Sequence, residues 1–207
     1  MSLDTTTREF EPGTTGWTAA DLDDPSIEAQ WDAGVYEIVE GVLTKMAPAY
    51  LDSTFPLGRL IFAVKRYLVE KQIPGDFGPE VDYVLAPKRV ARVDAVFMTP
   101  DDFRRQQELN ARTPSRRAKY GRLLTRPTLI IESISLGHES HDRELKRKWY
   151  AEAGVPNYWL FDAFDRSIEA LVLRDMEYET DCLARDEEEF KPSLFPGLIV
   201  PLKPIWI

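Results

Sequence analysis

Residues 128–135 have the sequence TLIIESIS, and this stretch decides the fold. Its Leu and Ile residues form a nearly continuous apolar run, which is typical of a strand buried on both faces at the centre of a sheet. The run contains a single acid, Glu132. The stretch therefore predicts a central strand that carries one carboxylate into the protein interior.

In the segments around this strand, the spacing of apolar residues is that of strands in some places and that of helices in others. Residues 36–40 and 42–46 are short strand-like runs joined at Gly41, which predicts a tight hairpin. Residues 53–72 and 140–153 carry apolar residues at helical spacing, which predicts two amphipathic helices. The other strand-like runs are 79–85, 92–98, 158–162 and 167–173.

The order of these elements predicts an α/β or α+β fold, in which helices cover the faces of a sheet. Residues 100–126 are polar and basic, and we expect a short helix there, followed by a surface loop. The whole chain has 207 residues, which fits one domain. We expect this domain to span residues 17–207, after a flexible segment at residues 1–16.

Charge is distributed unevenly along the chain. The net charge is -9, which as an average argues against a nucleic-acid partner. Residues 1–34 and 175–190 each hold eight acids and one base, whereas residues 101–126 hold eight bases and three acids. The sequence is therefore acidic at both ends and basic in the middle, so its average charge does not exclude DNA.

Signals for a cellular compartment are few. Cys182 is the only cysteine, which rules out an internal disulfide and favours a reducing compartment. The first residues show neither the basic nor the apolar region of a secretory signal, and no apolar run is long enough to span a membrane. A cytoplasmic location is expected, with no membrane association.

Two acids lie inside apolar strand-like runs, Asp94 in 92–98 and Glu132 in 128–135. Burying an ionised carboxylate costs several kcal/mol unless it is paired or bound to a metal. If the two strands are neighbours and both side chains lie on the same face of the sheet, their oxygens suit a hard divalent cation such as Mg²⁺ or Mn²⁺. The alternative is that each acid lies at a strand end and pairs with an arginine.

A lysine beside such carboxylates completes the minimum set for metal-assisted hydrolysis of a phosphodiester. The predicted helix 140–153 supplies Lys146 and Lys148. They lie two residues apart and so point in different directions, which lets at most one of them face the site.

Several runs resemble the Uma-type family of restriction-endonuclease-like proteins, in the PD-(D/E)XK nuclease superfamily. The runs are YEIVEGVL (36–43), RVDAVFM (92–98), LIIESIS (129–135), DRELKRKWYAEAGVPNYWLFD (142–162) and FPGLIV (195–200). The resemblance extends from about Thr18 to Leu202. It implies a restriction-endonuclease-like mixed sheet flanked by helices, and a metal-dependent nuclease site.

The resemblance assigns roles to four residues of this chain. The first two strand acids of the superfamily match Asp94 and Glu132, the expected metal ligands. The usual lysine position, two residues after the second acid, holds Ile134 here, and the family match instead places the lysine at Lys146. A further acid near the site matches Glu37, which we rank above Glu40.

This sequence also departs from the family pattern at three places. Val93 precedes the first acid where the family usually has Pro, and Leu136 stands where Pro often follows the second. Residues 50–53 lack the His that the family usually presents at the start of the long helix. The missing His removes one candidate proton carrier or ligand.

The remaining chemical candidates are weaker. His138 and His141 are expected to be surface-loop residues, because no further zinc ligands accompany them. The basic stretch from Arg104 to Arg126 either contacts DNA phosphates or pairs with the acidic ends of the chain. The aromatic residues around the second helix are expected to pack in the core.

The sequence therefore predicts a metal-dependent nuclease that hydrolyses phosphodiester bonds in DNA. Its expected catalytic residues are Asp94, Glu132, Lys146 and Glu37. A catalytically inactive binding module of the same fold is the alternative, and an assembly protein that uses a sheet edge is a third. By analogy with restriction-type nucleases that cut both strands, a homodimer is expected.

Overall fold

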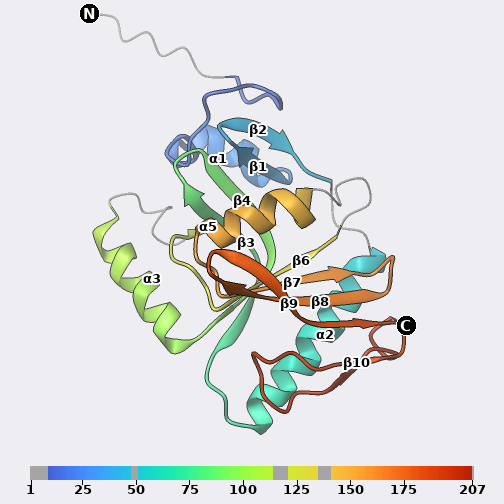
Figure 1. Cartoon of the computed structure of the whole chain (residues 1–207). Coiled ribbons are helices and arrows are strands. Elements are labelled where there is room, and N and C mark those ends of the chain that lie inside the picture. Colours follow the sequence, from blue (N-terminus) through green and yellow to red (C-terminus); the bar gives the residue numbers. More distant parts are fainter. Residues whose placement is uncertain (1–8, 48–50, 114–120, 135–140, 207) are drawn as a thin grey trace, which may run out of the picture.

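A computed structural model describes residues 9–47, 51–113, 121–134 and 141–206, and at 141 and 142 it describes the backbone alone. In these ranges a large mixed sheet has helices on both faces (Figure 1), which confirms the predicted α/β class. The principal path through the sheet is β2-β1-β4-β6-β7-β8-β9, and β3 joins it by pairing with β4 and with β5.

The sheet strands are β1 (Tyr36–Val39), β2 (Val42–Lys45), β3 (Asp76–Ala86), β4 (Arg89–Met98), β5 (Arg122–Leu123), β6 (Leu129–Ser133), β7 (Asn157–Asp162), β8 (Ser167–Arg174) and β9 (Glu177–Arg185). A separate small pair is formed by β10 (Glu189–Phe190) and β11 (Val200–Pro201). Strand β6 lies inside the sheet, antiparallel to β4 and parallel to β7. Its first four residues are buried, which confirms the prediction of a central strand.

The helices are α1 (Pro25–Asp32), α2 (Leu51–Glu70), α3 (Pro100–Arg112) and α5 (Arg147–Glu152), with a 3-10 turn η1 (Asp21–Asp23) and a π-helical segment η2 (His141–Lys146). The two predicted amphipathic helices thus correspond to α2 and to η2 continued by α5. No helix of the described ranges is long and apolar enough to cross a membrane.

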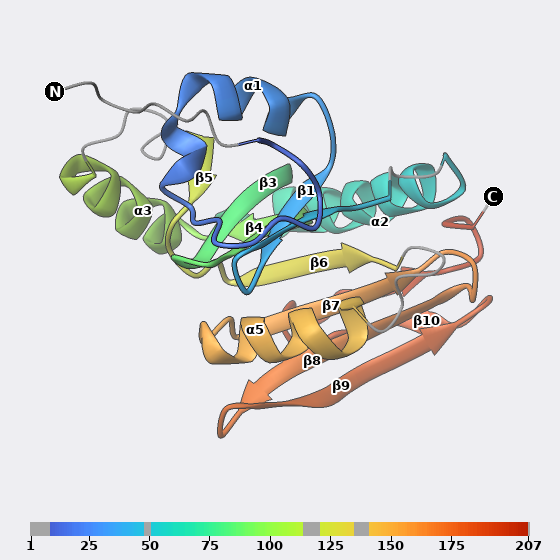
Figure 2. The same cartoon turned by 90° about the horizontal axis from the view of Figure 1, so that it is seen from above.

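Helices α2 and α5 cover opposite faces of the sheet (Figure 2). Leu60 and Val64 of α2 pack into the core formed by one face, together with Phe97. Trp149 and Tyr150 of α5 pack into the core on the other face. Side chains alternate along β4 and β6, so both faces of these central strands are apolar.

The N-terminal part forms a smaller core over the β1–β2 hairpin. Trp17 and Trp31 are buried there against Ile38. Residues 9–16 belong to the segment that we expect to be flexible, yet the described part of that segment is bonded to the hairpin. The Gly13 N–H donates to Leu43 O at 2.8 Å, and the Leu43 N–H donates to Thr14 O at 3.0 Å. These bonds attach residues 9–16 to the domain.

The expected surface loop after α3 contains a short buried strand. Arg122 and Leu123 form β5, which pairs in parallel with Asp82 and Tyr83 of β3. The Arg122 guanidinium contacts Asp23 at 2.9 Å and donates to Leu22 O at 2.6 Å. Arg122 is 5% exposed, so it connects β5 to the N-terminal part and presents little charge to solvent.

Replacing Arg122 with Leu is expected to destabilise the protein by about 2–3 kcal/mol, because Leu22 O and Asp23 lose a charged donor. Urea denaturation measures the free energy of unfolding. Arg112 ends α3 and is exposed, so the control Arg112→Leu should stay within about 0.5 kcal/mol of wild type. Equal losses in the two variants would contradict a structural role for Arg122.

Candidate active site

A buried ion cluster joins three of the four predicted site residues. Glu132 lies near the end of β6, Glu37 lies on β1, and Lys146 ends the η2 segment. Lys146 Nζ is 3.0 Å from Glu37 Oε1 and 3.2 Å from Glu132 Oε1. The exposed fractions of these residues are 4% for Lys146 and 1% for each glutamate. One ammonium group is thus shared by two carboxylates that are almost fully buried.

Lys148 and Glu40, the alternatives to Lys146 and Glu37, lie on the surface. Lys148 has a side chain that is 71% exposed and approaches Glu152 at 3.9 Å. Glu40 is exposed and accepts a hydrogen bond from Arg89 Nε at 2.7 Å. Glu37 in contrast accepts from the Arg92 backbone N–H at 3.2 Å, inside the sheet. The structure therefore places Lys146 and Glu37, rather than Lys148 and Glu40, beside Glu132.

Tyr150 also belongs to this cluster, whereas the sequence predicted only a core-packing role for it. Its hydroxyl donates a short hydrogen bond to Glu132 Oε1. Burial raises the pKa of Tyr150 well above its usual value, and the negative charge of Glu132 raises it further. The hydroxyl therefore keeps its proton and remains a donor. Lys146 and Tyr150 are four residues apart on one helical face, a spacing that was available in the sequence.

Asp94 contacts the backbone of β6 one residue after Glu132. Strands β4 and β6 pair through Ala95 and Ile131. Beyond that pair, the Ser133 N–H donates to Asp94 Oδ2 at 2.6 Å. The Asp94 carboxylate thus binds the backbone of the residue that directly follows Glu132.

A hollow of about 270 Å³ opens beside Asp94 on the α2 side of the sheet, and Ser133, Glu80 and Ser53 also line it. Ser133 Oγ is buried and has no hydrogen-bond partner, the one such side-chain atom among the described residues. Glu80 has a φ of 30°, an unusual value for a residue with a side chain. It lies on β3 between Pro79 and Val81, which pair with the two neighbours of Asp94. Sequence reasoning missed Glu80, because no local pattern signals this conformation.

The donor set suits a hard cation in ligand type. Magnesium takes oxygen ligands and keeps several waters, so one or two protein carboxylates are sufficient. With both glutamates ionised and Lys146 protonated, the cluster retains one negative charge, and Asp94 adds another. Across the described ranges, no group of three or more His, Cys, Asp or Glu side chains is arranged to hold a metal. The oxygen donors present are Asp94 at the hollow and Glu132 in the buried cluster.

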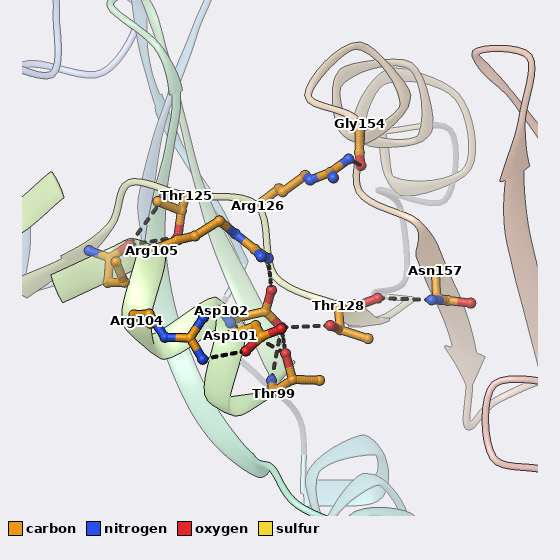
Figure 3. A network of polar contacts seen from close by, with 11 residues as sticks. Thr99, Asp101, Asp102, Arg104, Arg105, Thr125, Arg126, Thr128, Gly154 and Asn157 are labelled. Atoms are coloured by element: carbon orange, nitrogen blue, oxygen red, sulfur yellow. Dashed lines mark hydrogen bonds and ion pairs between the residues drawn. The ribbon is translucent and has the colours of Figure 1, made fainter. Parts of the chain in front are cut away.

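Three described arginines of the basic stretch, Arg104, Arg105 and Arg126, make contacts within the chain (Figure 3). Arg104 contacts Asp101 at 2.6 Å, and Arg105 pairs with Asp102. Asp102 also accepts from Thr128 Oγ1 at 2.5 Å, which connects the start of α3 to β6. The remaining bases Arg116, Arg117 and Lys119, and also His138, lie outside the described residues.

The mixed sheet with helices on both faces is a restriction-endonuclease-like fold. A family model named Uma2 and described as "Putative restriction endonuclease" matches residues 29–203. The chain belongs to this family, which confirms the resemblance seen in the sequence.

A solved structure has the same fold, "a putative nuclease belonging to DUF820" from Anabaena variabilis. The two chains are 15% identical and superpose with a TM-score of 0.56, over 83% of this chain and 89% of the other. At this identity the likeness shows the fold alone, and it confirms the predicted restriction-endonuclease-like sheet. A search of curated proteins found no match.

Replacing Lys146 with Met is expected to cost about 3–5 kcal/mol of stability near pH 7, because two buried carboxylates lose their shared cation. Urea denaturation measures the free energy of unfolding. The matched control Lys148→Met should stay within about 0.5 kcal/mol of wild type. A similar loss in both variants would argue against the shared ion pair.

Alkaline pH should unfold the protein through its buried tyrosines. The pKa values of Tyr83, Tyr150 and Tyr178 are raised above 10.0, with burial as the main cause. Above that pH the unfolded chain releases protons that the folded chain retains, so stability falls as pH rises. A fraction of the phenolate absorbance should therefore appear only at the higher pH at which the circular dichroism of the folded protein is lost. Tyr150→Phe should reduce this fraction, and ionisation of every tyrosine before unfolding would refute the interpretation.

Proposed function

We propose that this protein is a metal-dependent nuclease that hydrolyses phosphodiester bonds in DNA. The observation that carries the proposal is the buried Lys146 ammonium held between Glu132 and Glu37, with Asp94 bonded to the residue after Glu132. Membership of the Uma2 family supports it. Desolvation of each charge is costly, so two carboxylates and a lysine with so little exposed surface are a candidate functional site.

The proposed ligands of the cation, Mg²⁺ or Mn²⁺, are Asp94 and Glu132. When bound, such a cation polarises a phosphoryl oxygen and acidifies a water molecule. Lys146 holds a proton at Nζ and fixes Glu132 Oε1, while Glu37 holds the ammonium in place from the opposite side. Tyr150 restrains the same oxygen of Glu132 by donating its hydroxyl hydrogen.

The hollow beside Asp94 supports a place for the scissile group. Its Ser133 hydroxyl is buried without a partner, and a buried hydroxyl is favourable only when a hydrogen bond satisfies it. A phosphate oxygen or an ordered water at this position supplies the missing bond. For contact with the rest of the DNA, we propose the stretch Arg104–Arg126, excluding Arg122, which is buried.

A cleavage assay tests the proposal. Wild type should cut plasmid DNA with Mg²⁺ or Mn²⁺ and not after chelation, and Asp94→Asn should lower the rate by about 100-fold or more. Asparagine keeps an acceptor for the Ser133 N–H, which preserves the backbone contact. Glu132→Gln should act alike. The surface controls Lys148→Met and Glu40→Gln should retain full activity.

Undiminished cleavage by Asp94→Asn would refute the assigned site. If wild type cleaves no nucleic acid under any of these metal conditions, the inactive binding module is the correct alternative. Circular dichroism of each variant separates loss of chemistry from loss of folding.

A further inference from the structure

Helix α2 carries a stripe of large apolar side chains on the surface that faces away from the sheet. The exposed fractions are 73% for Leu51, 62% for Phe55, 67% for Phe62 and 78% for Val69. On a helix these positions lie within a narrow angular range, opposite the buried face of α2. Apolar side chains grouped in this way mark an interaction site more often than single exposed ones do.

The spacing of the stripe is that of a helix–helix seam. Leu51, Phe55, Gly58, Phe62 and Val69 fit steps of four and three residues, the repeat by which two helices pack along their length. Among the described residues, a Cβ built on Gly58 meets no heavy atom within 4 Å apart from the backbone of its own helix, so the middle of the seam is open. A phenylalanine of a facing helix fits over this position.

The seam continues into a second hollow at the start of α2. This hollow has a volume of about 760 Å³, and Leu51 and Phe55 line it together with Phe164 and Trp206. Charged residues line it as well, among them Asp52 and Arg59. It is distinct from the hollow beside Asp94, which lies along the other flank of α2 and which Gly58 of the seam also lines. A partner on the seam therefore has a mixed apolar and charged recess to fill and borders the proposed site at Gly58.

We propose that the partner is a second copy of this chain, packed so that the two α2 helices run antiparallel. The charges on one flank of the stripe support this choice. Asp52 near the start of α2 and Arg66 near its end are both exposed. They are 14 residues apart, nearly four helical turns, so they lie on the same flank.

An antiparallel pair brings Asp52 of each copy to Arg66 of the other, in two equivalent contacts around a two-fold axis. In a parallel pair the two copies of this flank lie on opposite sides of the seam, so Asp52 and Arg66 find no partner in each other. The antiparallel orientation is thus favourable at two contacts, while Arg59, midway between them on the same flank, faces its own copy at the axis and donates to Ile205 O at 3.1 Å. This inference identifies the interface of the expected homodimer and does not depend on DNA cleavage.

Sedimentation or light scattering of the full chain measures the oligomeric state. Wild type should be a dimer at micromolar concentration, and Phe62→Glu should raise the dimer dissociation constant by about 30-fold or more. Met176 is 60% exposed in the turn between β8 and β9, and the control Met176→Glu should leave the dimer intact. Both side chains are exposed, so the fold should survive both changes.

Charge reversal tests the orientation. Asp52→Arg and Arg66→Asp should each weaken the dimer, and the double variant should restore it, because the pair is rebuilt with its signs exchanged. A monomeric wild type would overturn the proposal and indicate a different macromolecule on this face. A dimer that is indifferent to Phe62→Glu would also overturn it, and failure of the double variant to recover would overturn the antiparallel orientation. None of these readings requires nuclease activity.

Discussion

The arrangement of the site depends on one ammonium group inside the protein. Lys146 lies between carboxylates that come from β1 and β6, and it reaches them from the helical segment that packs over the sheet. The three side chains are almost fully buried, so each charge requires the others as compensation. The hairpin, the central strand and the helix are therefore held in register by electrostatics as well as by packing. Tyr150 adds a neutral donor to the same oxygen that the lysine contacts, which restricts the orientation of that carboxylate further.

Much of the fold could be predicted from the sequence, because its central elements have strong periodic patterns. The run 128–135 is apolar enough to identify a central strand, and the hairpin at Gly41 has the alternation and turn of its type. Strand β5 has only two residues and is defined by its pairing with β3, so no local pattern marks it. No local pattern marks the bonds of residues 9–16 either, because their partner Leu43 lies in the hairpin that follows later in the chain.

The candidate site could be predicted in its acids and its lysine, but not in its surroundings. A charge inside an apolar strand conflicts with its neighbours, and that conflict is visible in the sequence at Asp94 and Glu132. Tyr150 produces no such conflict, because an aromatic residue on a helix is ordinary core material. Glu80 is visible only from the pairing register, which places it opposite Asp94, and from its backbone angle. The choice between Lys146 and Lys148 required the family match, and the structure places Lys146 in the cluster.

The hydrogen bond from the Ser133 backbone to Asp94 has a consequence for how proteins of this architecture change over time. The carboxylate occupies the position where β4 and β6 stop pairing, so it completes the sheet whether or not it takes part in chemistry. The same argument applies to the buried glutamates, because removing either one leaves the positive charge of Lys146 without full compensation. Selection for folding alone is therefore enough to retain these acids. A descendant that had lost all catalysis would still carry the sequence signature of a nuclease.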